Sequence, residues 1–407
     1  MGNDMSSSQA TPAAGSDQSE DSRSLFGGSI LDPIRDPYRA YARLRDEKPG
    51  VRMEGWTATT HLVTRYEDVA AGLKDSALFS ARGNARGIGL VMGRTILEME
   101  GAEHVRHRRI ATPSFSPRAL RGAVERDAER IAHEMIDAFV ERGRADLVSE
   151  FTFTYPLRVL AGIIGVPIAD FDEFHRWAID LISVAKDPAR GFAAGRSIVE
   201  YLQPVLEARR ADPREDLLSA LVTAEVEGER LAEEEVLSFL RLLLPAGAET
   251  TYRLTGSLLF ALLSHPEQAG SVRTDPALLD EAIEETLRWE SPVQLASREA
   301  TRDVILHGHR IPAGDLVAFS VGSANRDERQ FGDPDRFDLH RANKRDHVAF
   351  GLGEHFCLGS HLARLETRIA ATAILARLPR LRFASEQPAP IEGIAFRSPP
   401  EILVRFD

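Results

Sequence analysis

Cysteine is the scarcest residue of this chain, and Cys357 is the only one among 407 residues. A chain with one thiol cannot form an internal disulfide, so a reducing compartment such as the cytoplasm is expected. Zinc and iron–sulfur sites built on cysteine are excluded too, because they take about four protein ligands. Cys357 is therefore either a buried structural residue, the usual fate of a lone cysteine, or a ligand that acts alone.

Long apolar runs are also missing. The longest candidate, residues 237–263, is interrupted by Arg241, Pro245, Glu249 and Arg253, so no transmembrane helix is expected. The first ten residues lack the basic-then-apolar order of a signal peptide. Residues 1–24 are rich in small polar residues and contain no aliphatic run, which predicts a disordered tail with order beginning near residue 25.

Basic residues are outnumbered by acidic ones, 50 to 62, and the net charge is −12. This deficit argues against non-specific nucleic-acid binding and against a basic membrane-binding patch. Hydrophobic residues make up 43% of the chain, which is enough for a large core in one large domain or two smaller ones.

The spacing of apolar residues predicts mostly helices, with a few strands. Residues 79–98 show no period and are predicted to be a loop. Residues 303–320 alternate apolar and polar side chains around Pro312-Ala313-Gly314, which predicts a hairpin there. The remaining elements expected are helices over 38–45, 66–73, 119–210 and 231–265, a hairpin over 51–64, and closing strands over 381–383 and 401–406.

The only cysteine lies in a distinctive stretch, residues 347–366, which reads HVAFGLGEHFCLGSHLARLE. A Gly-rich turn precedes Cys357, and an amphipathic helical pattern follows it. The unpaired N–H groups and the dipole of a helix N-terminus favour negative charge, so a thiolate is expected here. A single thiolate can hold a haem iron, whose equatorial ligands come from the porphyrin.

This stretch resembles the haem-binding loop of the cytochrome P450 family, whose pattern is F-G-x-G-x-H-x-C-x-G followed by L-A-R. The matching residues are Phe350, Gly351, Gly353, His355, Cys357 and Gly359. The resemblance implies that Cys357 is the thiolate ligand of haem b and that the other motif residues contact the cofactor.

Two cationic residues, His104 and Arg108, lie four apart in GAEHVRHRR and would share one face of a helix. Taken alone, they fit a solvated helix face. The resemblance implies that they contact haem propionates. It also implies that the basic residues of this region lie near the surface where an acidic electron donor docks; they are Arg106, Arg109, Arg118 and Arg121.

The long helix predicted over 231–265 carries LLLPAGAETTYRL at its centre. Pro245 and Gly247 weaken a helix there, and such local inconsistency is expected at functional sites. The family has A-G-x-[D/E]-T at this place, which Ala246, Gly247, Glu249 and Thr250 match. The resemblance implies that Glu249 and Thr250 relay protons to bound oxygen. The alternative is a surface charge and a threonine that bonds back to its own helix.

The family's E-x-x-R pair matches Glu285 and Arg288, and Arg336 matches its third, arginine member. The resemblance implies that these three form a buried structural network. It further places Arg298 at another propionate contact and Val293 beside the substrate. The candidate pocket (residues 86–97, Leu242, Ala246, Val293 and Ile394) is mostly apolar and small, which favours a hydrophobic ligand such as a terpenoid, steroid or fatty acid.

Four motifs therefore match in the family's order over roughly residues 25–407. They imply a mainly helical fold with small sheets, formed as one domain that clasps haem b. They also imply a soluble, monomeric bacterial monooxygenase that inserts one atom of O2 into its substrate. No flavin or iron–sulfur segment is visible, so NAD(P)H would act through ferredoxin and ferredoxin reductase. A peroxide-using haem-thiolate enzyme and a non-enzymatic haem sensor remain alternatives, although no regulatory module is visible.

Overall fold

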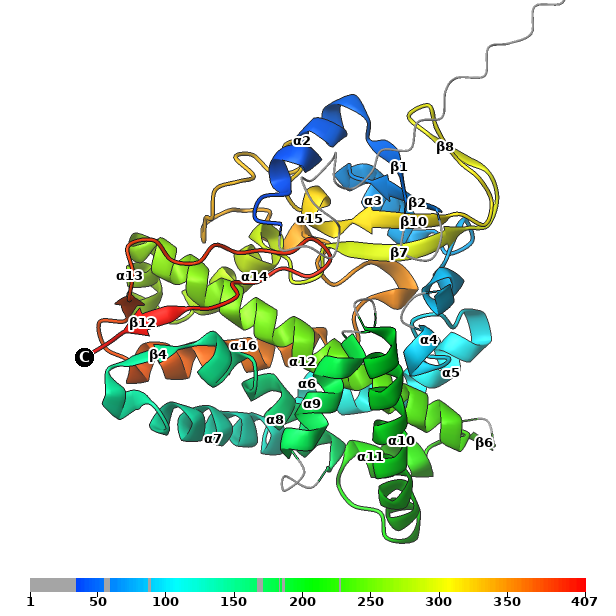
Figure 1. The fold of residues 1–407 in the computed structure, drawn as a ribbon, viewed down its shortest axis with the longest axis horizontal. Coiled ribbons are helices and arrows are strands. Elements are labelled where there is room, and N and C mark those ends of the chain that lie inside the picture. Colours follow the sequence, from blue (N-terminus) through cyan, green and yellow to red (C-terminus); the bar gives the residue numbers. More distant parts are fainter. Residues whose placement is uncertain are drawn as a thin grey trace, which may run out of the picture.

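The computed structural model describes residues 34–54, 59–86, 89–166, 171–182, 184, 187–226 and 228–407. The disordered tail predicted over residues 1–24, and the start of order near residue 25, lie outside the described residues. Most of the described chain is helical; in Figure 1 the largest sheet lies at the upper right, and β4 and β12 of a smaller sheet lie at the left. The predicted fold class, mainly α with small β-sheets, is confirmed.

One long helix, α12 (Glu233–Ser264), crosses the molecule diagonally and packs against α8, α14 and α16 (Figure 1). Its first turn holds three glutamates, which suit the positive end of the helix dipole. The Glu235 carboxylate accepts a hydrogen bond of 2.7 Å from the backbone N–H of Ala232 and so caps the helix. The helix expected over 231–265 is thus confirmed, and it runs on through Pro245.

The helices that surround α12 follow the predicted pattern, including those expected near 38–45 and 66–73. The first half of α12 contributes apolar side chains to one of the two largest buried clusters, and its second half contributes to the other. The other helices are α2 (Tyr38–Glu47), α3 (Tyr66–Lys74), α4 (Gly89–Met92), α5 (Gly101–Ala111), α6 (Pro117–Leu120), α7 (Ala123–Asp137), α8 (Tyr155–Ile164), α9 (Phe171–Ile182), α10 (Pro188–Ala211), α11 (Leu217–Thr223), α13 (Pro266–Thr274), α14 (Leu278–Trp289), α15 (Val321–Ala324) and α16 (Ser360–Arg377).

The largest sheet has five strands in the order β1-β2-β10-β7-β3. Strands β1 and β2 form the predicted hairpin over 51–64, with Gly50 opposite Val63. Strand β10 runs parallel to β2 and antiparallel to β7. These strands are β1 (Gly50–Glu54), β2 (Thr59–Val63), β3 (Phe79–Ser80), β7 (Leu295–Ala300) and β10 (Leu316–Ser320).

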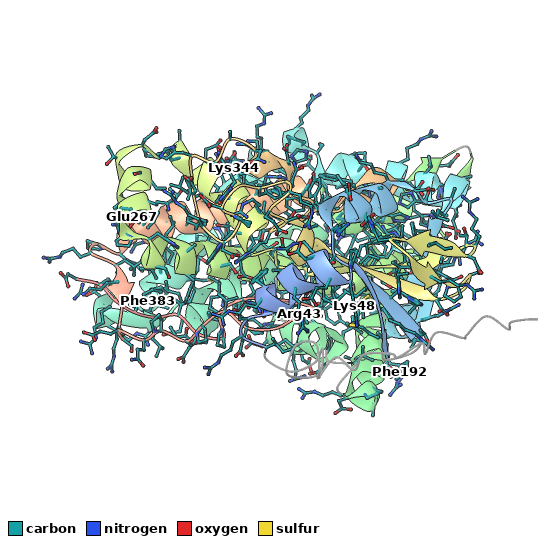
Figure 2. The ribbon with its side chains drawn as sticks, turned by 90° about the horizontal axis from the view of Figure 1, so that it is seen from above. Arg43, Lys48, Phe192, Glu267, Lys344 and Phe383 are labelled. Carbon is teal, nitrogen blue, oxygen red and sulfur yellow. The ribbon has the colours of Figure 1, made fainter. Side chains whose placement is uncertain are left out.

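The smaller sheets are β11-β12-β4, β5-β6 and β8-β9. The closing strands predicted near the C-terminus are confirmed as β11 and β12, which pair antiparallel. Figure 2 shows Phe383 on β11 and Phe192 on α10 near opposite ends of the molecule. The strands are β4 (Arg144–Asp146), β5 (Glu225–Val226), β6 (Glu229–Arg230), β8 (Val304–Leu306), β9 (His309–Ile311), β11 (Arg382–Phe383) and β12 (Leu403–Arg405).

Two local predictions are wrong. The hairpin in 303–320 turns at His307-Gly308, where φ is 49° and 81°, and not around Pro312. Two successive left-handed residues give the twist that a two-residue hairpin needs. The strand after Pro312, β10, pairs with β2 and β7 in the large sheet and so forms no hairpin with β9. Residues 79–98 are also not a plain loop, because they contain β3, the 3₁₀ turn η1 (Ala81–Arg86) and α4.

Candidate active site around Cys357

The loop before Cys357 is shaped by two glycines. Gly351 and Gly353 have φ of 69° and 73°, in the left-handed region that favours glycine. A Cβ on Gly353 would lie 3.0 Å from the carbonyl oxygen of Leu73, so α3 can approach only a glycine here. The backbone N–H of Cys357 donates to the carbonyl of Phe350 over 2.9 Å, which closes the loop and fixes the position of the sulfur.

The thiol of Cys357 meets two opposing effects. Its side chain is exposed, but the surrounding protein displaces much of the water near the sulfur, and this desolvation raises its pKa. The backbone N–H of Gly359 and the cations Arg108 and Arg364 act in the opposite direction without reversing the shift. The Gly359 N–H at the helix N-terminus favours the thiolate, as expected, but the loss of water around the sulfur has the larger effect on the pKa.

Four cationic or titratable side chains gather beside this loop from α5, β7 and the 3₁₀ turn η8 (Gly353–His355). The rings of His104 and His355 lie 4.4 Å apart, and Arg108 donates to the carbonyl of Phe356 over 2.8 Å. Burial lowers the pKa of His355 to about 3, with further lowering by Arg298, His104 and Arg108. Burial and the charge of Arg108 lower the pKa of His104 as well, so both imidazoles are shifted towards the neutral form.

This group lacks the negative partner that its composition calls for. The Nε2 atoms of His104 and His355 are buried without a hydrogen-bond partner. Within the described ranges, neither Arg108 nor Arg298 makes an ion pair, although Arg298 is 8% exposed. Buried polar groups are nearly always satisfied, so these atoms fit an anionic ligand with several oxygens. The two propionates of a haem would meet that requirement.

The centre of α12 carries the second predicted motif. A Cβ on Gly247 would lie 3.0 Å from a methyl carbon of Leu160, so the glycine allows α12 to pack closely on α8. The hydroxyl of Thr250 donates to the carbonyl of Ala246 over 2.7 Å. Thr250 thus bonds back to its own helix, as the alternative had it. Its hydroxyl oxygen keeps acceptor capacity.

Glu249 is 8% exposed, which excludes the alternative of a surface charge. Its carboxylate forms an ion pair with Arg253, one turn later on α12. Arg253 also donates to the hydroxyl of Ser398 over 3.0 Å. Sequence reasoning missed Arg253, although its i, i+4 spacing from Glu249 could have indicated the pair.

Comparison with known proteins decides what this geometry belongs to. A sequence model described as cytochrome P450 matches residues 181–402. The chain is 37% identical over 372 residues to cytochrome P450 107B1 of Saccharopolyspora erythraea, covering 86% of this chain and 90% of the relative. It is 38% identical to the monooxygenase PikC of Streptomyces venezuelae, covering 88% and 87%. The structure of CYP109Q5 from Chondromyces apiculatus matches with a TM-score of 0.84 at 38% identity, covering 91% and 95%.

The chain belongs to the cytochrome P450 family. It is therefore a haem-dependent monooxygenase, an oxidoreductase that incorporates oxygen from O2, as its bacterial relatives are named. Among the residues that the structure describes, no helix combines the length and apolar character needed to cross a bilayer.

The buried ion-pair network of this P450 differs from the prediction in one member. Glu285 and Arg288 are fully buried and meet through two contacts of 2.7 and 2.8 Å. The third side chain is that of Arg341, whose Nε lies 3.1 Å from Glu285. The prediction of Arg336 is wrong, because its side chain is exposed and only its main-chain carbonyl accepts from Arg288 and Arg341.

The predicted pocket residues of the P450 lie in two regions. Leu242 belongs to the buried cluster that also contains Val91 and Met92, from the segment 86–97. Val293 forms an isolated β-bridge with Phe396, whose side chain is 36% exposed. Ile394 is buried (2% exposed), so Phe396 presents the larger free surface in that turn.

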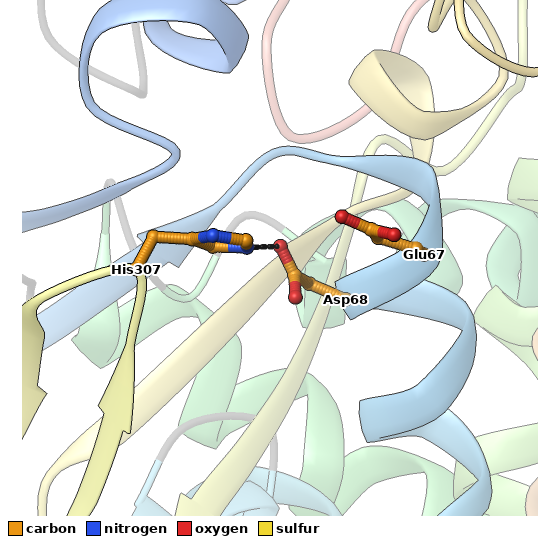
Figure 3. A group of neighbouring side chains, drawn as sticks. All are labelled: Glu67, Asp68 and His307. Carbon is orange, nitrogen blue, oxygen red and sulfur yellow. Dashed lines mark hydrogen bonds and ion pairs between the residues drawn. The ribbon is translucent and has the colours of Figure 1, made fainter.

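A separate group of possible metal ligands lies at the β8–β9 turn (Figure 3). Ligand atoms of Glu67, Asp68 and His307 lie within 4.8 Å of one another. The Nδ1 of His307 faces a donor, the guanidinium of Arg65, at 3.3 Å. The ring proton must then sit on Nε2, which donates to Asp68 over 2.8 Å. The group therefore acts as a polar link between the turn and α3, and no nitrogen is left for a metal.

Proposed function

We propose that Cys357 supplies the thiolate ligand of haem b and that His104, Arg108, Arg298 and His355 bind its propionates. The observation that carries this proposal is the buried, unpartnered pair of Nε2 atoms beside two arginines without ion pairs. Phe350, Gly351, Gly359, Ala246 and Gly247 would contact the porphyrin. A thiolate-ligated haem supplies O2 activation, because the thiolate pushes electron density to the iron and favours O–O cleavage.

We infer that Glu249 and Thr250 move protons for this reaction. The Thr250 hydroxyl, which now donates to the carbonyl of Ala246, would turn away from it, accept a hydrogen bond at its oxygen and pass on its own proton. Arg253 would hold the Glu249 carboxylate in position through their ion pair. Both residues lie on the helix that carries the family motif, one turn or less from Ala246, so they are close enough to act together.

The substrate we propose is a hydrophobic small molecule that is hydroxylated at a C–H bond. Leu242, Val293 and the Ile394–Phe396 turn would form its apolar surroundings. A relative 35% identical to this chain is named steroid C26-monooxygenase. A structure at 36% identity, CYP267B1, contains myristic acid. These names favour a steroid or a fatty acid over a polar metabolite.

The electron donor we propose is a ferredoxin, reduced by ferredoxin reductase at the expense of NAD(P)H. Arg118 on α6 and the neighbouring Arg121 are exposed on an otherwise acidic protein, which suits an acidic partner. We further propose that residues 25–407 form one P450 domain that acts as a cytoplasmic monomer.

One spectrum tests the core of this proposal. The reduced, carbon monoxide-treated holoenzyme should show the red-shifted absorption band that gives the family its name. Cys357→Ser should abolish that band. If the band is absent from the wild-type protein, or survives the substitution, the assignment of Cys357 is wrong.

Turnover then tests the donor and the substrate. Comparing activity on a ferredoxin–reductase pair with activity on peroxide distinguishes the monooxygenase from a peroxide-using enzyme. Screening steroids and fatty acids for a low-to-high-spin shift of the Soret band identifies the ligand class. A lack of response to both classes would contradict the proposed substrate.

A further inference from the structure

A buried carboxylate behind the Cys357 loop has no role in the function described so far. Glu284 on α14 is 3% exposed and directly precedes the Glu285 of the ion-pair network. It binds the guanidinium of Arg364 on α16 through two contacts, Nε–Oε1 at 2.5 Å and Nη2–Oε2 at 3.0 Å. Such a bidentate pair fixes the plane of the guanidinium as well as its position.

His347 supports the same carboxylate. Its Nε2 lies 3.2 Å from Glu284, and its Nδ1 accepts from the backbone N–H of Ala349 at 3.2 Å. Because Nδ1 is an acceptor, the ring proton is on Nε2 and points at Glu284. Burial opposes ionisation of Glu284, but the hydrogen bonds from His347 and Arg364 prevail and lower its pKa to about 2. The carboxylate is therefore charged and held at both oxygens.

The guanidinium that Glu284 holds lies against the Cys357 loop. The Cζ of Arg364 is 4.5 Å from the centre of the Phe350 ring, within the range of a cation–π contact. The carbonyl of Phe350 accepts the hydrogen bond from the N–H of Cys357. Arg364 therefore contacts the residue whose main chain holds the Cys357 backbone in place.

We propose that Glu284 is a positioning residue for the proximal ligand: it holds Arg364 flat over Phe350 and thereby sets the electrostatic field at the Cys357 sulfur. This inference rests on the proposed function of Cys357 as the haem ligand. The Arg364 side chain is 31% exposed, so without Glu284 it can turn outward, where water screens its charge.

The sign of a redox shift separates this role from a simple charge effect. Reduction adds an electron to the site, so a nearby positive charge raises the midpoint potential and a nearby negative charge lowers it. If Glu284 acted only through its own charge, Glu284→Gln would raise the potential. If it positions Arg364, the variant also loses the effect of the cation. Because Arg364 contacts the Cys357 loop through Phe350, losing the cation is the larger effect, and the potential falls as it does in Arg364→Gln.

The matched control is Glu281→Gln. Glu281 lies one turn earlier on the same helix and is paired with Lys344 and Arg345 rather than with Arg364. Arg345 also lies 3.8 Å from Glu284, so the control changes the surroundings of Glu284 while leaving its pair with Arg364 in place. The experiment measures the midpoint potential of each purified holoenzyme. It also measures how fast the red-shifted absorption band of the reduced, carbon monoxide-treated protein disappears. Arg364→Lys serves as a second variant, because it keeps the charge but loses the two-point pairing.

We expect Glu284→Gln, Arg364→Gln and Arg364→Lys to shift the potential in the negative direction. The thiolate-type band should be lost about tenfold faster, as is typical for outer contacts of metal ligands, while Glu281→Gln stays near the wild type. A positive shift in Glu284→Gln, or values equal to those of Glu281→Gln, would overturn the inference. Failure of the wild-type protein to show the band would instead overturn the role of Cys357.

Discussion

Thr250 and Glu249 show how single residues of the site are held before any ligand binds. Each polar group already has a partner, the Ala246 carbonyl for Thr250 and Arg253 for Glu249. A hydroxyl that already donates one hydrogen bond can still accept another at its oxygen. Both residues are thus satisfied at rest, and the proposed proton transfer would start from these contacts.

Thr250→Ala tests this arrangement directly. We expect electron consumption to continue while product per NAD(P)H falls at least about tenfold, because positioned proton transfer contributes about 10²–10⁴-fold. Thr250→Ser keeps the hydroxyl and should retain coupling. The measurement compares NAD(P)H consumed with product and peroxide formed. Full coupling in the alanine variant would refute the relay.

Glu284 makes a residue-level contribution to acid stability. Its pKa is lowered from 4.5 to about 2 in the folded protein, so its stabilising effect is complete above about pH 4.5 and is lost as the pH falls towards 2. The loss should be on the order of 2 kcal/mol. The test is denaturant unfolding of the wild type and of Glu284→Gln from roughly pH 6 to pH 3. The free energy of unfolding should depend less on pH in the variant. Equal slopes would contradict the assignment.

At the scale of elements, α14 is tied to the irregular segment before the Cys357 loop by buried charge. Arg288 donates to the main-chain carbonyls of Asn325, Pro334 and Arg336, besides its pairing with Glu285. Main-chain acceptors at three positions let one arginine stabilise a segment that has no regular secondary structure. The segment that leads into the Cys357 loop is therefore held in place by Arg288.

Arg341 and Arg336 give a matched test of that connection. Arg341→Ala removes a partner of the fully buried Glu285 and should destabilise the fold by about 3–5 kcal/mol. Arg336→Ala changes an exposed side chain whose main-chain carbonyl remains, and should stay within about 0.5 kcal/mol of the wild type. Denaturant unfolding compares the two. Equal losses of unfolding free energy in the two variants would show that Arg341 is not the third residue of the Glu285–Arg288 network.

At the scale of the whole molecule, charge is distributed unevenly. The chain carries −12 overall, yet α5 and α6 near Cys357 present arginines outward. A local positive surface on an acidic protein steers one kind of partner and repels most others.

Charge reversal on this surface tests the docking of an acidic donor. Arg118→Glu combined with Arg121→Glu should slow reduction by ferredoxin about tenfold at low salt, and added salt should reduce the difference. Arg273→Glu, on α13 in another part of the protein, changes the net charge without changing this surface. Stopped-flow reduction rates measure the effect. Equal slowing by both variants would point to net charge and not to a docking surface.

Much of this protein could be predicted from local patterns in the chain. The helix through Pro245, the hairpin over 51–64 and the Cys357 loop depend on spacing and on glycine geometry, which neighbouring residues determine. The turn at His307-Gly308 was missed because the first of its two left-handed residues is a histidine. Histidine is a weaker turn signal than the nearby proline and glycine.

The sequence by itself determined the family, the loop that carries Cys357 and the helix that carries Glu249 and Thr250, because each depends on contiguous residues. Only the tertiary structure decided that Arg341 and not Arg336 completes the buried network, that Arg253 holds Glu249, and that Glu284 holds Arg364. Glu284 and Arg364 are 80 residues apart along the chain. Such pairings depend on how whole helices pack, and burial makes them strong by removing the water that would otherwise compete.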